Sequence, residues 1–165
     1  EEIDAGPIML KKEIKLDNEM NAENESNKLS KLGSEIILDC LDLIEIGKAK
    51  FVDQNHSQAT YAKKINKSES NIHWEKNASD IIAKMNSLYP NPGASFFFEG
   101  ERYKILKAVL LNTEGQPGTV LDDSLTIACG LKSIKILEIQ RQGKNVQKTK
   151  DFLLGSKIKK GVVLS

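Results

Sequence analysis

The residues best suited to chemistry in this sequence are basic side chains in its C-terminal half. Residues 131–165 carry eight lysines and one arginine against two acids, a balance of +7, whereas residues 1–50 have a balance of −5. Such side chains neutralise phosphates without reading bases, so the pattern predicts an RNA-binding surface; the alternative is a solvated, lysine-rich face. The candidate phosphate-binding residues are Arg102, Lys104 and Lys107 on one expected strand, and Lys135, Arg141, Lys144, Lys148 and Lys150 around the last one.

A surface that binds single-stranded RNA also needs exposed aromatic rings on which bases can stack. Phe96, Phe97, Phe98 and Tyr103 are the candidates. Strand alternation places at least one of the three phenylalanines inside, and we expect most of these rings to belong to the core.

Other kinds of chemistry find little support. The two histidines, His56 and His73, and the two cysteines, Cys40 and Cys129, have no metal-ligand spacing, and the sequence holds no phosphate-binding glycine loop. We therefore expect no metal and no disulfide. Trp74, next to His73, is interpreted as an anchor that packs the linker onto the following domain.

Asp4 is the remaining candidate. It lies between Ile3 and an Ala-Gly-Pro stretch. That stretch predicts a turn, because Gly6 supplies unusual backbone angles and Pro7 fixes its own. Asp is common in turns, where its side chain accepts backbone N–H bonds. On local evidence alone a turn residue is the simpler interpretation, with a catalytic carboxylate as the alternative.

The first seventy residues predict elements that cannot form a core by themselves. Residues 8–17 favour a strand, residues 27–46 a helix with one apolar face, and Gly47 a helix stop, while residues 51–70 are a polar connector. One strand and one helix cannot bury that apolar face. The segment is therefore interpreted as the tail of a larger domain.

The remaining residues predict a compact β domain. Asn77 is expected to cap a helix, with Asp80 completing a capping box, and Pro90 and Pro92 to end it. Five short strands follow: a hairpin turning near Gly100, two strands turning at Asp122-Asp123, and a strand over 133–140. Their spacing favours a five-stranded oligonucleotide-binding (OB) barrel in an α+β protein. Residues 151–165 are expected to form a short helical turn and a frayed end.

Composition sets the class of protein. With 39% hydrophobic and 28% charged residues, the 165-residue chain has the composition of a soluble globular protein. No apolar run is long enough to span a membrane, and the basic-then-apolar pattern of a secretory signal is missing, so we expect a cytosolic or organelle-matrix location.

Ten short stretches, in this order, resemble the C-terminal part of the bacterial methionyl-tRNA formyltransferase family. The resemblance covers essentially the whole chain and implies a cytoplasmic bacterial enzyme that transfers a formyl group from 10-formyltetrahydrofolate to the α-amino group of methionyl initiator tRNA, with no metal. The stretches are IDAGPI, IGKAK, ATYAKKI, IHWEKNASDII, YPNPGA, GERYKILKA, PGTV, IACG, LEIQRQGK and DFL.

The resemblance also implies domains and a site. Residues 1–50 correspond to the end of a Rossmann-like catalytic domain, 51–70 to a linker and 71–165 to the tRNA-binding OB-like barrel. Asp4 matches the catalytic Asp of the family's Leu-Asp-x-Gly motif, whereas the Asn-x-His and Ser-Leu-Leu-Pro elements have no match, so this chain alone is expected to be inactive. Three residues depart from the family pattern. The family often has Asp where this chain has His73, Trp where it has Asn91, and Lys where it has Asn145.

The expected partner is initiator methionyl-tRNA, and the expected state is a monomer. Two other functions remain open. One is a related enzyme, such as a sugar-nucleotide formyltransferase or a formyltetrahydrofolate dehydrogenase, against which the basic C-terminal third argues. The other is a stand-alone nucleic-acid-binding barrel without catalysis.

Overall fold

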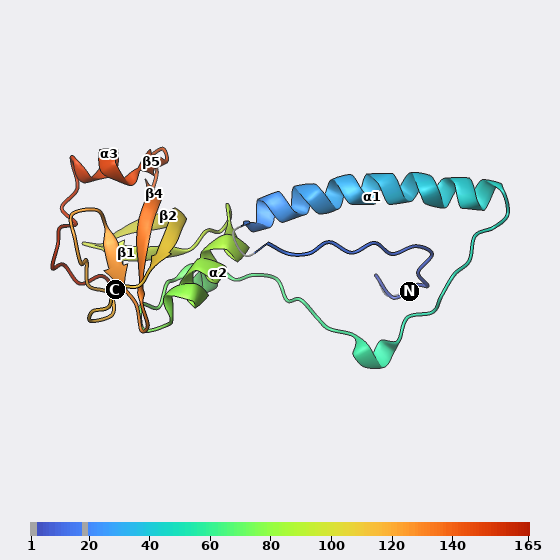
Figure 1. Cartoon of the computed structure of the whole chain (residues 1–165), viewed down its shortest axis with the longest axis horizontal. Coiled ribbons are helices and arrows are strands. Elements are labelled where there is room, and N and C mark those ends of the chain that lie inside the picture. Colours follow the sequence, from blue (N-terminus) through green and yellow to red (C-terminus); the bar gives the residue numbers. More distant parts are fainter. Residues whose placement is uncertain (1–2, 18–19) are drawn as a thin grey trace. The chain divides into compact units, whose positions relative to one another are not determined.

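The computed structural model describes residues 3–17 and 20–165, and these form two compact units. Residues 3–17 and 23–64 belong to unit 1, and residues 20–22 and 65–165 to unit 2. Figure 1 shows helix α1 and its neighbouring extended segments in unit 1, and the sheet with two shorter helices in unit 2. Residues 1–2 and 18–19 of the catalytic-domain segment expected over 1–50 lie outside the described residues.

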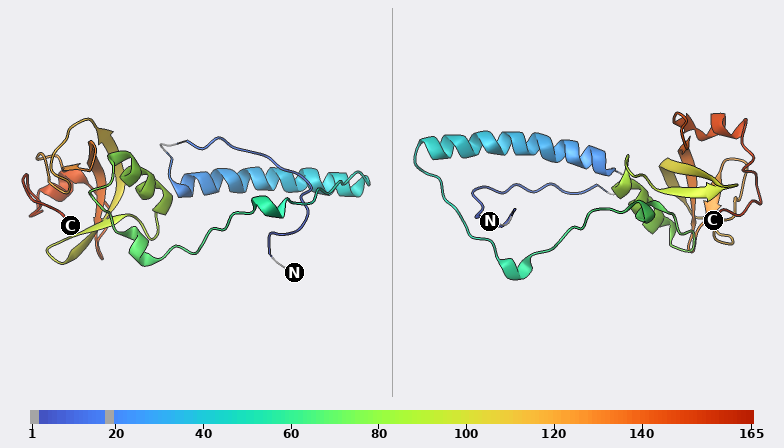
Figure 2. Two further views of the ribbon diagram at one scale, coloured as in Figure 1. Left: turned by 90° about the horizontal axis from the view of Figure 1, so that it is seen from below. Right: turned by 180° about the vertical axis from the view of Figure 1, so that it is seen from behind.

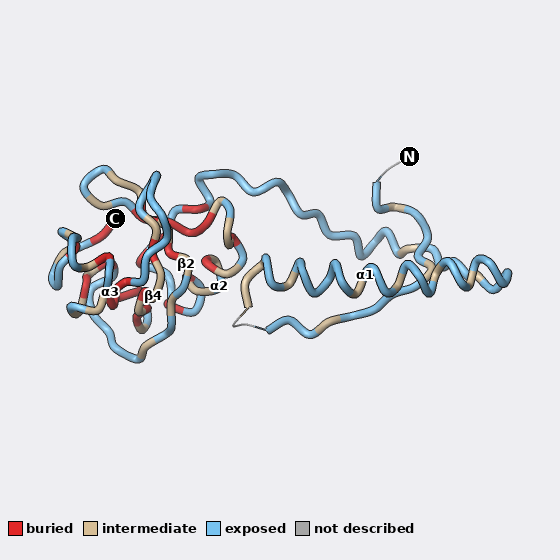
Figure 3. The backbone as a smooth tube through the Cα atoms, turned by 90° about the horizontal axis from the view of Figure 1, so that it is seen from above, coloured by how far each residue is buried: buried red, intermediate tan, exposed pale blue. Residues whose placement is uncertain are grey.

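Unit 1 is built around the long helix α1 (Ala22–Glu45), which has no buried residue. Leu41 and Ile44 are both more than half exposed, and the helix is pale blue and tan along its length in Figure 3. Gly47 ends it as expected: its φ is +64°, and Lys48 N–H donates to Leu43 O over 2.8 Å. Leu32, Ile36 and Cys40 are half-buried, so the described residues of unit 1 cover the apolar face of α1 only in part.

The strand expected over residues 8–17 is wrong for the described chain. The segment is extended but makes one isolated antiparallel bridge, between Ile8 and Val52, with N–H to O distances of 2.8 and 2.9 Å. A strand needs a ladder of partners, and the connector that reaches this segment offers a single pairing position. The connector contains two short 3-10 turns, η1 (His56–Gln58) and η2 (Lys67–Ser70).

Helix α2 (Ala78–Leu88) opens the compact part of unit 2 and buries the expected apolar face, with Ile81 and Met85 facing the core. The expected capping box is wrong, because the Asn77 side chain makes no cap hydrogen bond. Its backbone instead forms a parallel bridge with Leu131, whose carbonyl accepts from Ala78 N–H over 3.0 Å. The Leu131 carbonyl thus satisfies one of the N–H groups that the start of a helix leaves without a partner inside the helix.

The sheet contains five antiparallel strands in the order β1-β2-β4-β3, with β5 paired to β4. The β1–β2 hairpin turns at Glu99-Gly100, both with positive φ, as a two-residue hairpin requires. Figure 2 shows α2 beside this sheet in two further views. The strands are β1 (Ser95–Phe98), β2 (Glu101–Leu111), β3 (Thr126–Ala128), β4 (Ser133–Arg141) and β5 (Gln147–Lys148).

The expected closure into a five-stranded barrel is not found, because the ladder formed by these strands is open. Of the two strands expected around Asp122-Asp123, only the second, β3, is formed; the first is reduced to bridges at Thr119 and Val120. The chain end was expected to be frayed, but Val163 bridges Thr119, and Ser165 O accepts from Phe97 N–H of β1 over 3.2 Å. Isolated backbone pairings of Thr119, Val120 and the chain end therefore take the place of the further strand that a barrel would need.

The core of unit 2 contains a run of aromatic rings. Trp74 is 4% exposed and lies 5.7 Å from Phe96, which stacks on Tyr103 at 5.5 Å, and Tyr103 meets Phe152 edge-on at 5.8 Å. The expectation that Trp74 is an anchor is confirmed by this burial. Phe152 belongs to α3 (Thr149–Leu153), a short helix tied to β4 by a hydrogen bond from Thr149 Oγ1 to Ile136 O over 2.7 Å.

Candidate nucleic-acid interface

The pairing of β2 with β4 changes its phase near the middle of both strands. Tyr103 and Ile105 face the core opposite Arg141 and Ile139, whereas further along β2 it is Ala108 that lies opposite the buried Ile136. Between these regions Lys107 pairs with Glu138, and the register shifts on both sides of Lys107.

This irregularity decides the side on which Lys107 lies. Strict alternation from Tyr103 and Ile105 would turn Lys107 toward the core, and alternation from Ile134 and Ile136 would do the same to Glu138. Lys107 is instead exposed, and Glu138 is half-buried. An irregular pairing that re-aims side chains in this way is a known use of β-bulges.

Beside this irregularity is a groove of about 530 Å³ lined mainly by lysines. The half-buried Leu137 and Leu153 also line it, and Asp123 and Glu138 are its two acids. Against these two carboxylates stand four lysines, so the groove has a formal charge of +2. We call it the lysine groove; its lysines are Lys107, Lys135, Lys148 and Lys150.

A second groove, of about 720 Å³, contains two further basic candidates, Arg141 and Lys144. Arg141, Lys144 and Lys157 line it together with three acids, Glu99, Glu101 and Asp151, so its formal charges cancel. We call it the balanced groove. The sequence prediction treated all the basic residues as one set, and the structure divides them between surfaces of different net charge.

The arginine of the balanced groove is already paired with an acid. Arg141 Nη2 donates to Glu101 Oε1, and the hydroxyl of Tyr103 donates to Glu101 Oε2 over 2.9 Å. These two hydrogen bonds, first that from Arg141, hold the pKa of Glu101 below its ordinary value of 4.5. The same pairing raises the pKa of Arg141, and burial, followed by the bond to Glu101, raises that of Tyr103.

Arg102 and Lys104, expected to bind phosphates, are held by neighbouring protein groups. Arg102 donates from Nε to Ser95 Oγ over 2.9 Å and from Nη2 to Ser70 Oγ over 3.2 Å, and both serines are buried. Lys104 Nζ lies 3.4 Å from Asn91 Oδ1, and burial, followed by the charge of Arg102, lowers its pKa. The geometry of these two residues fits a role in holding the segments around Ser70 and Asn91 against the hairpin.

The aromatic candidates divide as alternation requires. Phe96 and Tyr103 are buried in the core, Phe98 lines the balanced groove, and Phe97 is 43% exposed on the hairpin opposite Arg102. Phe97 is therefore the most accessible of the four rings for stacking. It lies on a different strand from every residue of the lysine groove.

Asp4, in unit 1, occupies a turn with a φ of +63° and is exposed. Its backbone is held, since Gln54 Nε2 donates to Asp4 O over 2.9 Å and to Gly6 O over 2.7 Å. The local geometry agrees with the turn that the sequence predicted. Gln54 was missed, because a polar residue in a connector gives no sequence signal for a contact about fifty residues away.

Sequence reasoning also missed the carboxylates that set the charge of each groove. Glu101 and Glu138 lie on the same strands as the basic candidates, and pairing in a sheet brings them beside Arg141 and Lys107. Counting acids along with bases on each expected strand would have found them.

The described residues include no cluster of three or more His, Cys, Asp or Glu side chains that could hold a metal ion. No helix in that part of the chain is long and apolar enough to cross a membrane.

Comparison with known proteins places these features in a family. Residues 64–157 match the family described as "Formyl transferase, C-terminal domain". The chain is similar to methionyl-tRNA formyltransferases from Pelagibacter ubique, at 51% identity over 98% of this chain and 52% of the relative, and from Rhodopseudomonas palustris strain BisB18, at 39% over 93% and 51%. The chain thus spans about half the length of the curated relatives it matches.

Solved structures show the same fold at lower identity. HypX from Aquifex aeolicus in complex with tetrahydrofolic acid has a TM-score of 0.74 and 20% identity, covering 97% of this chain and 30% of that protein. At this identity the likeness concerns the fold alone.

The division of basic residues leads to a test by stability. Arg102→Met should lower the free energy of unfolding by about 1 to 3 kcal/mol, because it leaves the buried Ser95 and Ser70 without a charged donor. The matched change Lys107→Met, on the exposed side of the same strand, should stay within about 0.5 kcal/mol. Urea unfolding measures both, and equal effects would show that Arg102 is not a structural residue.

Proposed function

The chain belongs to the formyl transferase family, whose C-terminal domain it contains, and we propose that it is the C-terminal part of a methionyl-tRNA formyltransferase in which unit 2 binds tRNA. The observation that carries the tRNA role is the lysine groove, which opposes four lysines to two acids. The 51% identity to a methionyl-tRNA formyltransferase supports the choice of substrate. The partner in this proposal is initiator methionyl-tRNA.

The lysine groove suits contact with the RNA backbone. Its lysines are point charges on flexible stems, which neutralise phosphates without fixing a base sequence. Such contacts would hold the tRNA body and leave recognition of the methionyl end to another part of the enzyme. An auxiliary RNA-binding domain is expected to contribute affinity in this way and to leave substrate recognition to the catalytic domain.

The reaction proposed for the whole enzyme is acyl transfer. The α-amino group of the methionyl ester attacks the formyl carbon of 10-formyltetrahydrofolate. As the formamide forms, the amine gives up one proton, the bond from the formyl carbon to the folate nitrogen breaks, and that nitrogen leaves carrying a proton. We assign Asp4 to the catalytic carboxylate by its Ile-Asp-Ala-Gly match, in the role of orienting a base. Asp4 is exposed, so the described residues of this chain form no enclosed folate site around it.

The same proposal assigns residues 1–50 to the end of the Rossmann-like catalytic domain, 51–70 to the linker and 71–165 to an OB-like tRNA-binding domain. The partly exposed apolar face of α1 supports the first assignment, because a helix with that face normally packs against further structure. The enzyme is proposed to act as a monomer in the bacterial cytoplasm without a metal.

RNA binding without catalysis describes what this chain could do by itself. Unit 2 has its own buried core, so its grooves do not need unit 1 to be formed. A sugar-nucleotide formyltransferase or a formyltetrahydrofolate dehydrogenase is less well supported, since neither substrate needs a groove that accumulates positive charge.

The tRNA role predicts a salt dependence set by the groove. If its four lysines each neutralise one phosphate, log affinity for tRNA should fall with log salt at a slope of about −3.6, using about 0.9 per phosphate. The double variant Lys107→Ala/Lys148→Ala should make the slope shallower by about two units. Fluorescence anisotropy with labelled tRNA at several salt concentrations measures it.

Two controls keep this test specific. Lys76→Ala and Lys160→Ala each remove an exposed lysine that lines neither groove; each should change the slope by less than half a unit, well below the roughly one unit of a phosphate contact. A slope that responds to all these changes alike would mean that RNA binds to diffuse charge and not in the groove.

The catalytic assignment predicts a separation between binding and turnover. The 165-residue chain should not formylate methionyl-tRNA when given 10-formyltetrahydrofolate, because Asp4 has no enclosed site. In a full-length enzyme that contains this chain, Asp4→Asn should lower kcat by about a hundredfold or more and leave tRNA affinity unchanged. Near-normal kcat would reduce Asp4 to a turn residue, and turnover by the chain alone would show that its site is complete.

A further inference from the structure

Starting from the proposed function, that unit 2 binds RNA phosphates, we propose that the balanced groove contains a second phosphate site in which the Glu101 carboxylate occupies Arg141 until RNA displaces it. Glu101 would then act as an internal competitor that weakens tRNA binding. The proposal concerns a surface other than the lysine groove and a residue that binds no RNA itself.

The sheet builds this site from its backbone register. Tyr103 of β2 lies directly opposite Arg141 of β4, and Glu101 is two residues before Tyr103, so all three project from one face. Beyond the end of the ladder, Gln142 N–H donates to Arg102 O over 2.9 Å and keeps β2 and β4 together. The carboxylate therefore meets the guanidinium because of strand pairing, without help from a flexible loop.

Both partners remain accessible. The side chain of Arg141 is 47% exposed and that of Glu101 is 40% exposed, so an incoming anion can reach the guanidinium. Carboxylate and phosphate present similar pairs of oxygens to an arginine, and the two ligands compete for the same N–H groups. A backbone phosphate of RNA carries one negative charge, as the carboxylate does, so it can compete with a Glu101 carboxylate that is partly hydrated.

Once Glu101 has moved, the positive charges around Arg141 would attract a phosphate. Lys144 and Lys157 line the same groove, and Lys157 Nζ is itself 3.3 Å from Glu99 Oε2, in a pair that is mostly exposed. With Glu101 and Glu99 displaced, Arg141, Lys144 and Lys157 would present three positive charges against the one negative charge of Asp151. The acids thus hide a basic site that a count of lysines and arginines detects but the net charge does not.

A purely structural role is the competing explanation of the Glu101–Arg141 pair. Exposed ion pairs add little to stability, and the residues around this one are held by the ladder and by the packing of Tyr103 on Phe96. Removing the carboxylate should therefore leave unit 2 folded. It should change what Arg141 binds.

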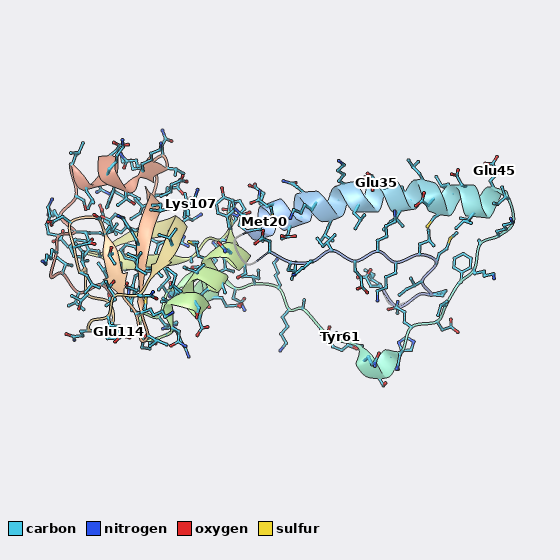
Figure 4. The ribbon with its side chains drawn as sticks, viewed as in Figure 1. Met20, Glu35, Glu45, Tyr61, Lys107 and Glu114 are labelled. Carbon is cyan, nitrogen blue, oxygen red and sulfur yellow. The ribbon has the colours of Figure 1, made fainter. Side chains whose placement is uncertain are left out.

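The test uses Glu101→Gln, with Glu114→Gln as a matched control. Both changes remove one negative charge from unit 2, but Glu114 is exposed and lies beyond the end of β2, well separated from Lys107 in Figure 4. Inorganic phosphate is titrated into each protein and its binding is measured by calorimetry, with the Arg141 Nε–Hε NMR signal followed in the proteins that retain Arg141. The affinity for tRNA is measured in parallel. Thermal unfolding confirms that each variant is folded.

Glu101→Gln should tighten phosphate binding at Arg141 by about two- to fivefold, the range that an exposed ion pair commands. Glu114→Gln should match the parent chain, and adding Arg141→Gln to Glu101→Gln should remove the gain. Equal phosphate binding by the two single variants, or a gain that survives the loss of Arg141, would overturn the inference.

The phosphate and tRNA measurements separate this inference from the function on which it rests. If the parent chain does not bind tRNA, the proposed function fails, while the phosphate titration still shows whether Glu101 masks Arg141. If tRNA binds and Glu101→Gln strengthens it no more than Glu114→Gln does, the masking of an RNA site is wrong and the tRNA role stands. A tRNA gain that appears only with Arg141 present supports both.

Discussion

The pairing of β2 with β4, and the phase change in its middle, is the constraint on which the surface of unit 2 depends. A strand exposes alternate side chains, so one local irregularity reassigns every residue beyond it to the opposite face. Here the change lets Tyr103 and Ile105 face the core at one end and Ile134 and Ile136 at the other. Lys107 and Glu138 fall at the change and are both kept out of the core.

The charges of the surface follow from that constraint together with the parts that cover the sheet. Near the hairpin, Arg102 donates hydrogen bonds to Ser70 and Ser95, and Lys104 donates one to Asn91. At the phase change and beyond it, four lysines line a groove with an excess of positive charge. At the hairpin end of the β2–β4 ladder, Glu101 neutralises Arg141, so this arginine adds no net charge to the surface unless its acid moves away.

The sequence was a good guide to elements whose signals are local. Helix α2, the Gly100 hairpin, the β4 strand and the burial of Trp74 all follow from periodicity, turn chemistry and residue size. It misled where the outcome depended on distant partners: residues 8–17 lack a ladder, the Asn77 cap is replaced by Leu131, and Thr119 and Val120 pair irregularly with the chain end. The basic set was the clearest case, since its composition was visible but its division required the register.

Whether the lysine groove is the main place where tRNA meets this domain can be measured most directly by observing single lysines. In the 165-residue chain with its lysines isotopically methylated, NMR signals of Lys107, Lys135 and Lys148 should shift together as a tRNA acceptor stem is added. The signal of Lys104, held beside Asn91, should stay in place. Shifts at Lys104 with none at the three groove lysines would contradict the division of the basic residues by the β2–β4 pairing.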